Sequence, residues 1–451
     1  MTMGYFKNIF IKYSPVFIQN ILISIYNSRL YQVRHSGIYR EKFEYYKNLD
    51  GLTLDEAKEI QRKKLNDFLT FATKNSSWYE KFSDYNSLSQ FPILTKEELI
   101  NNLDKIKTIP DEKGIVSYTG GTTGASLKVI YTESDMQERF AILDSFRAIY
   151  GYKLGSKVAW FSGKEIVSKN KSVKFHRDDY INKIRFFSTF HINKENFDFY
   201  WKALKDFSPE FIVGFPSSLY EICLIAKSRN LKLDTKVKVF FPTAETVLPV
   251  HRELIKEILG CVLIDQYASS EGAPFILECK EGKKHLQLLS GVFEVVDEKN
   301  QPAKSGELIV TSFNTHGTPL IRYKIGDRVT LGDSSETCKC GSPFPIVESI
   351  EGRNTDYIES PQYGKVNLGN ISNATKGIEG IIQFQIIQYK INSVEVRLVV
   401  SECFDKLNKT KFIEALKVRF GDEMFIDIII VDNIEKENSG KFRIVKRMLE
   451  V

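Results

Sequence analysis

The alternation of short apolar segments with amphipathic segments between residues 157 and 264 restricts the fold of this chain more than any other feature. Four apolar segments have the length and residue types of buried strands: Lys157–Phe161, Phe211–Gly214, Val237–Phe241 and Cys261–Ile264. Three segments between them have helical patterns: Phe197–Lys205, Leu219–Lys227 and Pro249–Leu259. Strands that alternate with helices are typical of an α/β sheet with parallel strands. The sequence therefore predicts the α/β fold class.

The rest of the chain predicts two further parts. At 451 residues it is too long for one compact core. From about Phe293, short strands alternate with Gly, Asp and Asn turns, which predicts a β-rich subdomain at about residues 290–350. After Gly352 strand and helix patterns return, which predicts a small α+β C-terminal domain over residues 352–451. Residues 1–351 would then form a large N-terminal domain of mixed and parallel sheets with helices.

The charge balance and the cysteine content exclude two broad classes of protein. The 63 Lys and Arg residues exceed the 57 Asp and Glu residues by 6, and no dense basic stripe with interleaved aromatic residues occurs. We therefore expect no nucleic-acid partner. The six cysteines are unevenly placed and no cleavable signal peptide is evident. Both observations favour a reducing, cytoplasmic location over a secreted, disulfide-bonded one.

The N-terminal segment Phe6–Tyr31 is apolar and aromatic, interrupted by basic residues. Its longest apolar run, Val16–Ile25, is too short to span a bilayer. Two interpretations stay open. The segment forms a helix that packs on the protein core, or a helix that lies on a membrane surface with its basic residues near the headgroups. The second would give residues 1–40 a membrane contact and make the protein peripheral to the inner face of the membrane.

A loop of three glycines and three threonines lies between two segments with strand patterns. It consists of Thr119, Gly120, Gly121, Thr122, Thr123 and Gly124. Glycine lets the backbone approach an anion closely and present its N–H groups to it. The following segment, Leu127–Thr132, is β-branched and aromatic, so this is not the nucleotide loop that opens a helix. We interpret the motif as strand, phosphate-binding loop and strand, with Lys128 at its far end. A glycine-rich hairpin turn is the alternative.

Four further motifs carry polar residues suited to a nucleotide. Asp265–Gly272 directly follows a predicted strand, where ligands of open α/β sheets bind, and its tyrosine and glutamate suit a purine and Mg²⁺. Asp327 follows a glycine at a strand edge and suits ribose hydroxyls. Arg353 lies at the predicted domain boundary, and Lys441 lies in a glycine turn near the chain end. Taken singly, each is equally typical of a solvated turn or a basic tail.

The order and spacing of these motifs resemble those of the adenylate-forming superfamily, which contains acyl- and aryl-CoA ligases, luciferases and peptide-synthetase adenylation domains. The resemblance is to its phenylacetate–CoA ligase and CapK (capsular polysaccharide) branch and spans nearly the whole chain. It implies an ATP-dependent, AMP-forming ligase for a small-molecule carboxylic acid. Such a ligase makes an acyl- or aryl-adenylate, releases pyrophosphate and transfers the acyl group to CoA, an amine or a hydroxyl. It also implies that the C-terminal domain is a mobile lid.

The resemblance further implies individual roles. The phosphates are held by the loop Thr119, Gly120, Gly121, Thr122, Thr123 and Gly124, with Lys128 nearby. The adenine is framed by Ala244, Glu245, Asp265 and Tyr267, and the ribose is bound by Asp327 and Arg353. Ser270 lies by the reacting carboxylate and α-phosphate, Glu271 binds Mg²⁺, and Lys441 bridges the carboxylate and the α-phosphate. A carboxylate attacking a phosphate joins two anions, so Mg²⁺ and a lysine must neutralise the developing charge.

Three departures from the superfamily pattern bear on the acceptor. Gly120-Gly121 replaces Ser-Gly, as in the CapK-like branch, and Ala268 replaces the glycine after the tyrosine. The hinge position falls at Thr355, and the following segment, Ser360–Gln362, lacks the Arg-Gly of CoA ligases. This last departure favours an amine or hydroxyl on a sugar, and hence a role in surface polysaccharide biosynthesis. A non-catalytic, membrane-associated nucleotide-binding component of an envelope polysaccharide pathway is the alternative.

A second group of residues suggests a structural metal. Cys338 and Cys340 form the CxCG turn common in zinc knuckles, and Cys279 and His285 lie six residues apart. Four Cys and His ligands on two turns would make a closed tetrahedral zinc site. The alternative is four unrelated residues. Some phenylacetate–CoA ligase-like proteins carry a similar set, which favours a structural Zn²⁺.

Overall fold

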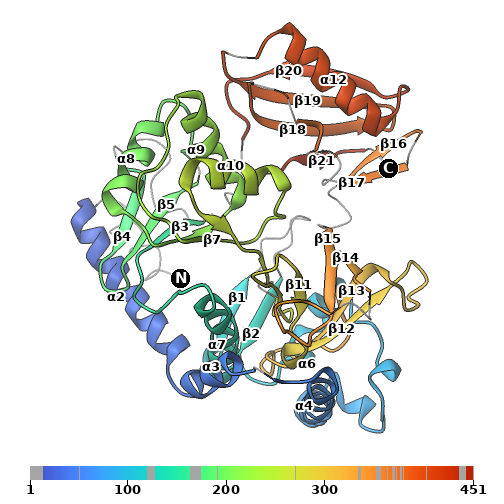
Figure 1. The fold of residues 1–451 in the computed structure, drawn as a ribbon. Coiled ribbons are helices and arrows are strands. Elements are labelled where there is room, and N and C mark those ends of the chain that lie inside the picture. Colours follow the sequence, from blue (N-terminus) through green and yellow to red (C-terminus); the bar gives the residue numbers. More distant parts are fainter. Residues whose placement is uncertain are drawn as a thin grey trace. The chain divides into compact units, whose positions relative to one another are not determined.

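The computed structural model describes residues 14–49, 51–118, 127–162, 174–189, 191–269, 271–333, 337–351, 357–362, 364–367, 371, 373–375, 378, 380–402, 404–435 and 443–449. The chain divides into two compact units (Figure 1). We call Met1–Tyr26, Gly155–Leu263 and Glu351–Val451 the parallel-sheet unit. We call Asn27–Leu154 and Ile264–Ile350 the antiparallel-sheet unit.

A six-stranded sheet forms the centre of the parallel-sheet unit, in the order β4-β5-β3-β6-β7-β8. Its strands are β3 (Val158–Ser162), β4 (His176–Asp179), β5 (Ile184–Ser188), β6 (Phe211–Gly214), β7 (Val239–Pro242) and β8 (Val262–Leu263). Five are parallel, and β4 is an antiparallel edge strand. The helices α8 (Phe197–Phe207), α9 (Pro216–Ser228) and α10 (Pro249–Leu259) share one apolar core with the sheet. The predicted alternation of strands and helices is confirmed.

The C-terminal part of this unit is α+β, as predicted. Its four-stranded sheet has the order β20-β19-β18-β21, and β16 pairs with β17 beside it in sequence. The elements are β16 (Tyr357–Ser360), β17 (Gly364–Asn367), β18 (Ile381–Lys390), β19 (Ser393–Val400), α12 (Lys406–Phe420), β20 (Phe425–Ile430) and β21 (Val445–Arg447). Three side chains of α12, Phe412, Leu416 and Phe420, are fully buried in the core that they share with this sheet.

The antiparallel-sheet unit contains a seven-stranded sheet in the order β12-β13-β14-β15-β11-β10-β9. Its strands are β9 (Gln266–Tyr267), β10 (Ile276–Glu278), β11 (Lys284–Leu286), β12 (Gly291–Val296), β13 (Ser305–Ser312), β14 (Tyr323–Leu331) and β15 (Ile346–Glu351). The predicted β-rich segment thus belongs to a sheet that also contains three short strands before residue 290. The hairpin of β1 (Ile115–Tyr118) and β2 (Lys128–Tyr131) lies in the same unit.

The helices of the antiparallel-sheet unit begin where local sequence predicts. They are α3 (Tyr39–Lys47), α4 (Leu54–Asn75), α5 (Lys96–Asn101), α6 (Leu103–Ile106) and α7 (Glu133–Ala148). Thr53, Thr95 and Thr132 each accept a hydrogen bond from the backbone N–H three residues later, and the acid at that position bonds back. These capping boxes fix the starts of α4, α5 and α7, because they satisfy N–H groups that the first helical turn leaves without partners.

The N-terminal helix α2 (Val16–His35) departs from one of its two predicted forms. Its buried residues are polar: Gln19, Asn20 and Ser24. Phe17 and Ile21 on the same helix are 61% and 47% exposed. An amphipathic helix that packs on a core would bury its apolar side chains. That interpretation is therefore wrong for the described part of α2.

Candidate functional site

The hairpin of β1 and β2 presents the predicted phosphate loop. Tyr118 pairs with Lys128, so residues 119–126 connect the two paired strand ends. This is the strand, loop and strand order that the sequence predicts. The Lys128 ammonium forms an ion pair with Asp111, which also lies 3.3 Å from Lys107 Nζ. Lys128 therefore already has a carboxylate partner at the base of the loop.

Several predicted site residues lie outside the described residues, and their roles stay predictions. They are Thr119, Gly120, Gly121, Thr122, Thr123, Gly124, Ser270, Arg353 and Lys441. Among the described ones, Ala244 and Glu245 belong to the parallel-sheet unit, whereas Asp265, Tyr267, Glu271 and Asp327 belong to the antiparallel-sheet unit.

The segment from Ser312 to Leu320 fixes β2, the strand that leaves the phosphate loop. Ile130 N donates to Thr318 Oγ1 at 2.9 Å. Gly317 lies so close to this strand that a Cβ atom would come within 2.5 Å of Ile130 O. Only glycine allows this approach. The far side of the segment is tied to Thr108, whose Oγ1 donates to His316 O at 2.6 Å.

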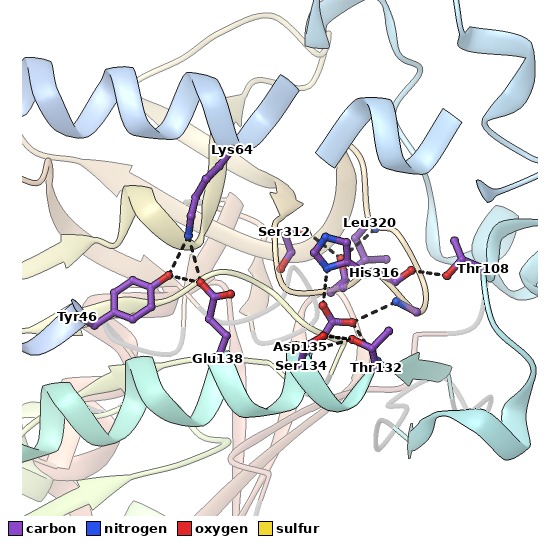
Figure 2. A network of polar contacts seen from close by, with 12 residues as sticks. Tyr46, Lys64, Thr108, Thr132, Ser134, Asp135, Glu138, Ser312, His316 and Leu320 are labelled. Carbon is purple, nitrogen blue, oxygen red and sulfur yellow. Dashed lines mark hydrogen bonds and ion pairs between the residues drawn. The ribbon is translucent and has the colours of Figure 1, made fainter. Parts of the chain in front are cut away.

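A buried carboxylate fixes the start of α7, the helix that follows β2 (Figure 2). Asp135 accepts bonds from Thr132 N at 3.0 Å and Gly317 N at 3.2 Å, and its Oδ1 lies 2.6 Å from His316 Nδ1. Burial acts to raise the pKa of the Asp135 carboxyl, but the His316 and Thr132 contacts outweigh it and hold that pKa below its usual range. The carboxylate therefore joins the helix start to the segment that supports β2.

A second buried carboxylate lies one turn further along α7 (Figure 2). Glu138 Oε1 accepts from Tyr46 Oη at 2.6 Å and from Lys64 Nζ at 3.1 Å. Lys64 Nζ also donates to Leu289 O at 2.8 Å. Burial acts to raise the pKa of Glu138, and the Lys64 charge outweighs it and lowers that pKa. With Asp135, this carboxylate holds α7 rigidly in the antiparallel-sheet unit, because breaking either buried pair would leave an uncompensated charge.

Arg139, the next residue on α7, binds the loop that carries Glu271. Its guanidinium donates to Ser269 O at 3.1 Å and to Ala273 O at 3.0 Å, so it holds the backbone on both sides of Glu271. The rings of Tyr131 and Phe275 lie 5.6 and 4.9 Å from the guanidinium carbon. Sequence patterns did not single out Arg139.

Glu271 is buried and lies close to the strand that leaves the phosphate loop. Its side chain is 6% exposed. Burial raises the pKa of Tyr131 on β2 to about 12, and the Glu271 charge adds to this rise. The next residue, Gly272, has φ +99°, and a Cβ there would lie 2.4 Å from Thr315 Cγ2. Glycine is therefore required beside Glu271 for two reasons, its φ angle and its close contact.

Tyr267 and Asp327, predicted to bind the adenine and the ribose, contact each other. Tyr267 Oη donates to Asp327 Oδ2 at 2.6 Å. Asp327 does not lie in an ordinary turn. Between β13 and β14 the register shifts, so that residues 325–327 face Leu308 alone, and Gly326 has φ +86°. This is a β-bulge, which re-aims a side chain at a sheet position where regular pleating would not.

Asp265 and Glu245 both have protein partners. Asp265 N donates to Glu278 Oε2 at 2.6 Å, and the Asp265 carboxylate lies 3.3 Å from Lys284 Nζ. In the other unit, Glu245 accepts from Ser217 N at 3.0 Å and Ser217 Oγ at 2.9 Å, at the start of α9. A carboxylate at a helix N-terminus is stabilised by the N–H groups there. Glu278 and Lys284 were not singled out from the sequence.

The four predicted zinc ligands converge. The ligand atoms of Cys279, His285, Cys338 and Cys340 all lie within 4.8 Å of one another. Cys279 Sγ and Cys338 Sγ are 3.7 Å apart. Cys340 Sγ and His285 Nε2 are 3.4 Å apart. Tetrahedral coordination with Zn–S bonds of about 2.3 Å requires an Sγ–Sγ distance of about 3.8 Å. The cluster therefore fits a zinc ion.

The surroundings of His285 also fit a metal ligand. His285 Nδ1 lies 2.8 Å from Phe344 O, so Nδ1–H donates to this carbonyl and Nε2 keeps its lone pair. Nε2 is the atom that points to the thiols, as in metal sites whose histidine is oriented by a carbonyl. Burial raises the pKa of the Cys340 thiol to about 12. A bound cation would stabilise the thiolate against this effect.

Comparison with known proteins gives concordant matches. Protein CapK of Staphylococcus aureus is 34% identical over 451 aligned positions, which cover 97% of this chain and 98% of that protein. Phenylacetate-coenzyme A ligase of Pseudomonas putida is 24% identical over 283 positions, 60% of this chain and 62% of that protein. Residues 358–448 match the CapK C-terminal domain. A crystal structure of 2-hydroxyisobutyryl-CoA ligase with R3-HIB-AMP has a TM-score of 0.70 at 15% identity, covering 88% of this chain and 91% of that one.

Proposed function

This chain belongs to the CapK family of the adenylate-forming superfamily, and we propose on that basis that it activates a carboxylic acid as an acyl- or aryl-adenylate at the expense of ATP. The observation that carries this proposal is the bond between Tyr267 and Asp327 at a bulge in β14. It holds together a ring suited to stack on adenine and a carboxylate suited to bind ribose. ATP as a substrate agrees with the expected cytoplasmic location.

The chemistry follows from the charges of the reactants. The substrate carboxylate attacks the α-phosphate, the bond to pyrophosphate breaks, and a mixed anhydride with AMP forms. We assign the loop 119–124 to the phosphates, Ala244, Glu245, Asp265 and Tyr267 to the adenine, Asp327 and Arg353 to the ribose, and Ser270 and Lys441 to the reacting groups. Glu271 is an oxygen ligand of the type that Mg²⁺ prefers. When bound, Mg²⁺ neutralises phosphate charge. Arg139 holds the Glu271 loop on both sides.

The acceptor of the acyl group distinguishes two versions of this proposal. CoA is the acceptor in the names of the ligase relatives. The segment Ser360–Gln362 replaces the Arg-Gly of CoA ligases, and its polar atoms bond within the C-terminal part: Ser360 Oγ donates to Phe420 O, and Gln362 Oε1 accepts from Asp422 N. We therefore propose an amine or hydroxyl acceptor on a sugar, in surface polysaccharide biosynthesis, with CoA as the second candidate.

Exchange of labelled pyrophosphate into ATP, measured with a library of carboxylic acids, tests the activation step. We expect exchange with at least one acid, and severe loss in Lys441→Ala with ATP binding retained. Lys406→Ala removes an exposed lysine from α12 in the same domain and should exchange normally. Wild-type exchange in Lys441→Ala would refute the role of Lys441. ATP binding without exchange for any acid would favour the non-catalytic alternative.

We also propose that Cys279, His285, Cys338 and Cys340 hold a structural zinc ion. The convergence of three thiols and an oriented imidazole supports it. Zinc would join the turn after β10 to the CxCG turn, which are about sixty residues apart in the chain. Metal analysis of protein purified without chelator tests the site. We expect about one zinc per chain, and less than about half an equivalent would refute the proposal.

A further inference from the structure

The helix α2 is turned with its polar side inward. Gln19, Asn20 and Ser24 are at most 7% exposed, whereas Ile25 and Tyr26 are 48% and 61% exposed. Phe17 and Ile21 continue this apolar side toward the start of the helix, since residues four apart share a helix face. A helix whose apolar side faces outward is unusual for a surface helix, which normally buries that side.

The inward side is fixed by hydrogen bonds to β4, the edge strand of the parallel sheet (Figure 1). Asn20 Oδ1 accepts from Asp178 N at 3.1 Å, and Ser24 Oγ accepts from Tyr180 N at 2.9 Å. Arg177 Nε donates to Gln19 Oε1 at 2.5 Å. Rotation of the helix about its axis would leave buried backbone N–H groups without partners, which is costly. The outward position of the apolar side is therefore a consequence of specific packing.

A second segment extends the same surface. The turn between β4 and β5 exposes 58% of Tyr180 and 56% of Ile181. Tyr180 Oη accepts a hydrogen bond from Asn20 Nδ2 at 2.9 Å, so this turn lies against α2. We call these side chains the α2 patch: Phe17, Ile21, Ile25, Tyr26, Tyr180 and Ile181. Apolar side chains that gather from two segments mark a docking surface more than scattered ones do.

The charge around the α2 patch selects its partner. Residues 1–40 contain no Asp or Glu and contain five Lys and Arg residues: Lys7, Lys12, Arg29, Arg34 and Arg40. Arg29 lies on α2 and is exposed. An apolar helix side combined with basic residues is typical of a helix that lies in the interface of an anionic membrane. A second copy of the chain fits less well, because a twofold contact would bring the same basic residues together.

We propose that the α2 patch docks the protein onto an anionic membrane surface, with α2 parallel to the membrane and its apolar side chains in the headgroup region. No helix among the described residues is long and apolar enough to cross a membrane. The docking is therefore peripheral. It is independent of the proposed ligase chemistry, since the patch residues take no part in the predicted nucleotide site.

Flotation of the full-length protein with vesicles tests this inference. We expect flotation with phosphatidylcholine–phosphatidylglycerol vesicles, and much less with phosphatidylcholine alone or at high salt. Ile21→Ser and Ile25→Ser should each weaken binding about tenfold or more, because each removes a buried aliphatic side chain from the interface. Val418→Ser, at a residue 74% exposed on α12, should bind as wild type.

Two results would overturn the proposal. One is equal flotation of the wild type and the Ile21→Ser/Ile25→Ser double variant. The other is a dimer in solution that this double variant dissociates, with no vesicle binding by either protein, which would assign the patch to a second copy. Circular dichroism and thermal unfolding verify that the variants are folded, which the outward position of both side chains leads us to expect.

Discussion

Replacement of Arg139 by methionine should reduce both stability and adenylation. The guanidinium makes two hydrogen bonds to backbone carbonyls, Ser269 O and Ala273 O, from a buried position. A hydrogen bond to a charged group contributes about 1.5–3 kcal/mol, so two give about 3–6 kcal/mol. Methionine restores part of this by packing between Tyr131 and Phe275, where the arginine now lies. We therefore expect the free energy of unfolding to fall by about 3 kcal/mol.

The functional effect of Arg139→Met depends on the position of Glu271. The two carbonyls lie on both sides of this residue, so loss of the guanidinium releases the backbone that aims its carboxylate. A displacement of a ligand by about 1 Å can lower a rate about a hundredfold. If Glu271 binds Mg²⁺, pyrophosphate exchange should fall about a hundredfold and require more Mg²⁺ for half-maximal rate.

The assay is urea unfolding together with pyrophosphate exchange at graded Mg²⁺ concentrations. Arg139→Lys keeps the charge but lacks the planar, two-pronged donor, so its Mg²⁺ requirement should be intermediate. Arg62→Met removes an exposed arginine that pairs with Glu59 on α4 and should change neither measurement. A loss of stability with an unchanged Mg²⁺ requirement would show that Arg139 is structural only. Wild-type stability would refute the reasoning altogether.

Three further outcomes are expected. Gly272→Ala should lower exchange and cost more than about 1 kcal/mol of stability, since alanine disfavours φ +99° and its Cβ would meet Thr315; an unchanged variant would contradict this. Cys338→Ser should lose zinc by metal analysis, whereas Cys261→Ala, which is buried elsewhere, should keep it. Burial lowers the pKa of His251 from 6.5 to about 3. Stability should therefore fall by about 1.4 kcal/mol per pH unit as pH drops between these values, and urea titrations should find no such loss from this position in His251→Asn.

Features set by neighbouring residues in the chain could be predicted from the sequence. The capping box of Thr53 and Glu56 lies within four residues, and the structure forms it. The strands and helices between residues 157 and 264 follow from local apolar patterns, and they appear within a few residues of the predicted bounds. The zinc ligands could be named as a set because cysteine and histidine are rare and chemically specific.

Features set by distant residues could not be predicted. Arg139 acts through carbonyls more than a hundred residues away, and carbonyl acceptors have no sequence pattern. The only available signal was α7 itself, whose charged residues interrupt its apolar pattern and turn out to be buried. The outward apolar side of α2 depends on polar bonds to β4, which its own sequence does not contain. Composition alone therefore suggested the opposite orientation.

The zinc cluster lies close enough in the sheet to affect the nucleotide site. Cys279 directly follows β10, and β10 pairs with β9, where Ile276 faces Tyr267. The last residue of β10, Glu278, accepts the bond from Asp265 N and, through its carbonyl, one from Tyr150 Oη at 2.6 Å. The metal would therefore fix the end of the strand that positions both predicted adenine residues.

Removal of zinc should thus weaken ATP binding as well as stability. If the turn after β10 loosens, Glu278 no longer holds Asp265, and the strand bearing Tyr267 loses a rigid neighbour. We expect zinc-depleted protein to stay folded at low temperature but to bind ATP about tenfold more weakly, a cost of about 1.4 kcal/mol, roughly one hydrogen bond. Titration calorimetry before and after chelation, with zinc added back as the control, measures this. Equal affinity in both forms would show that the metal stabilises only its own hairpin.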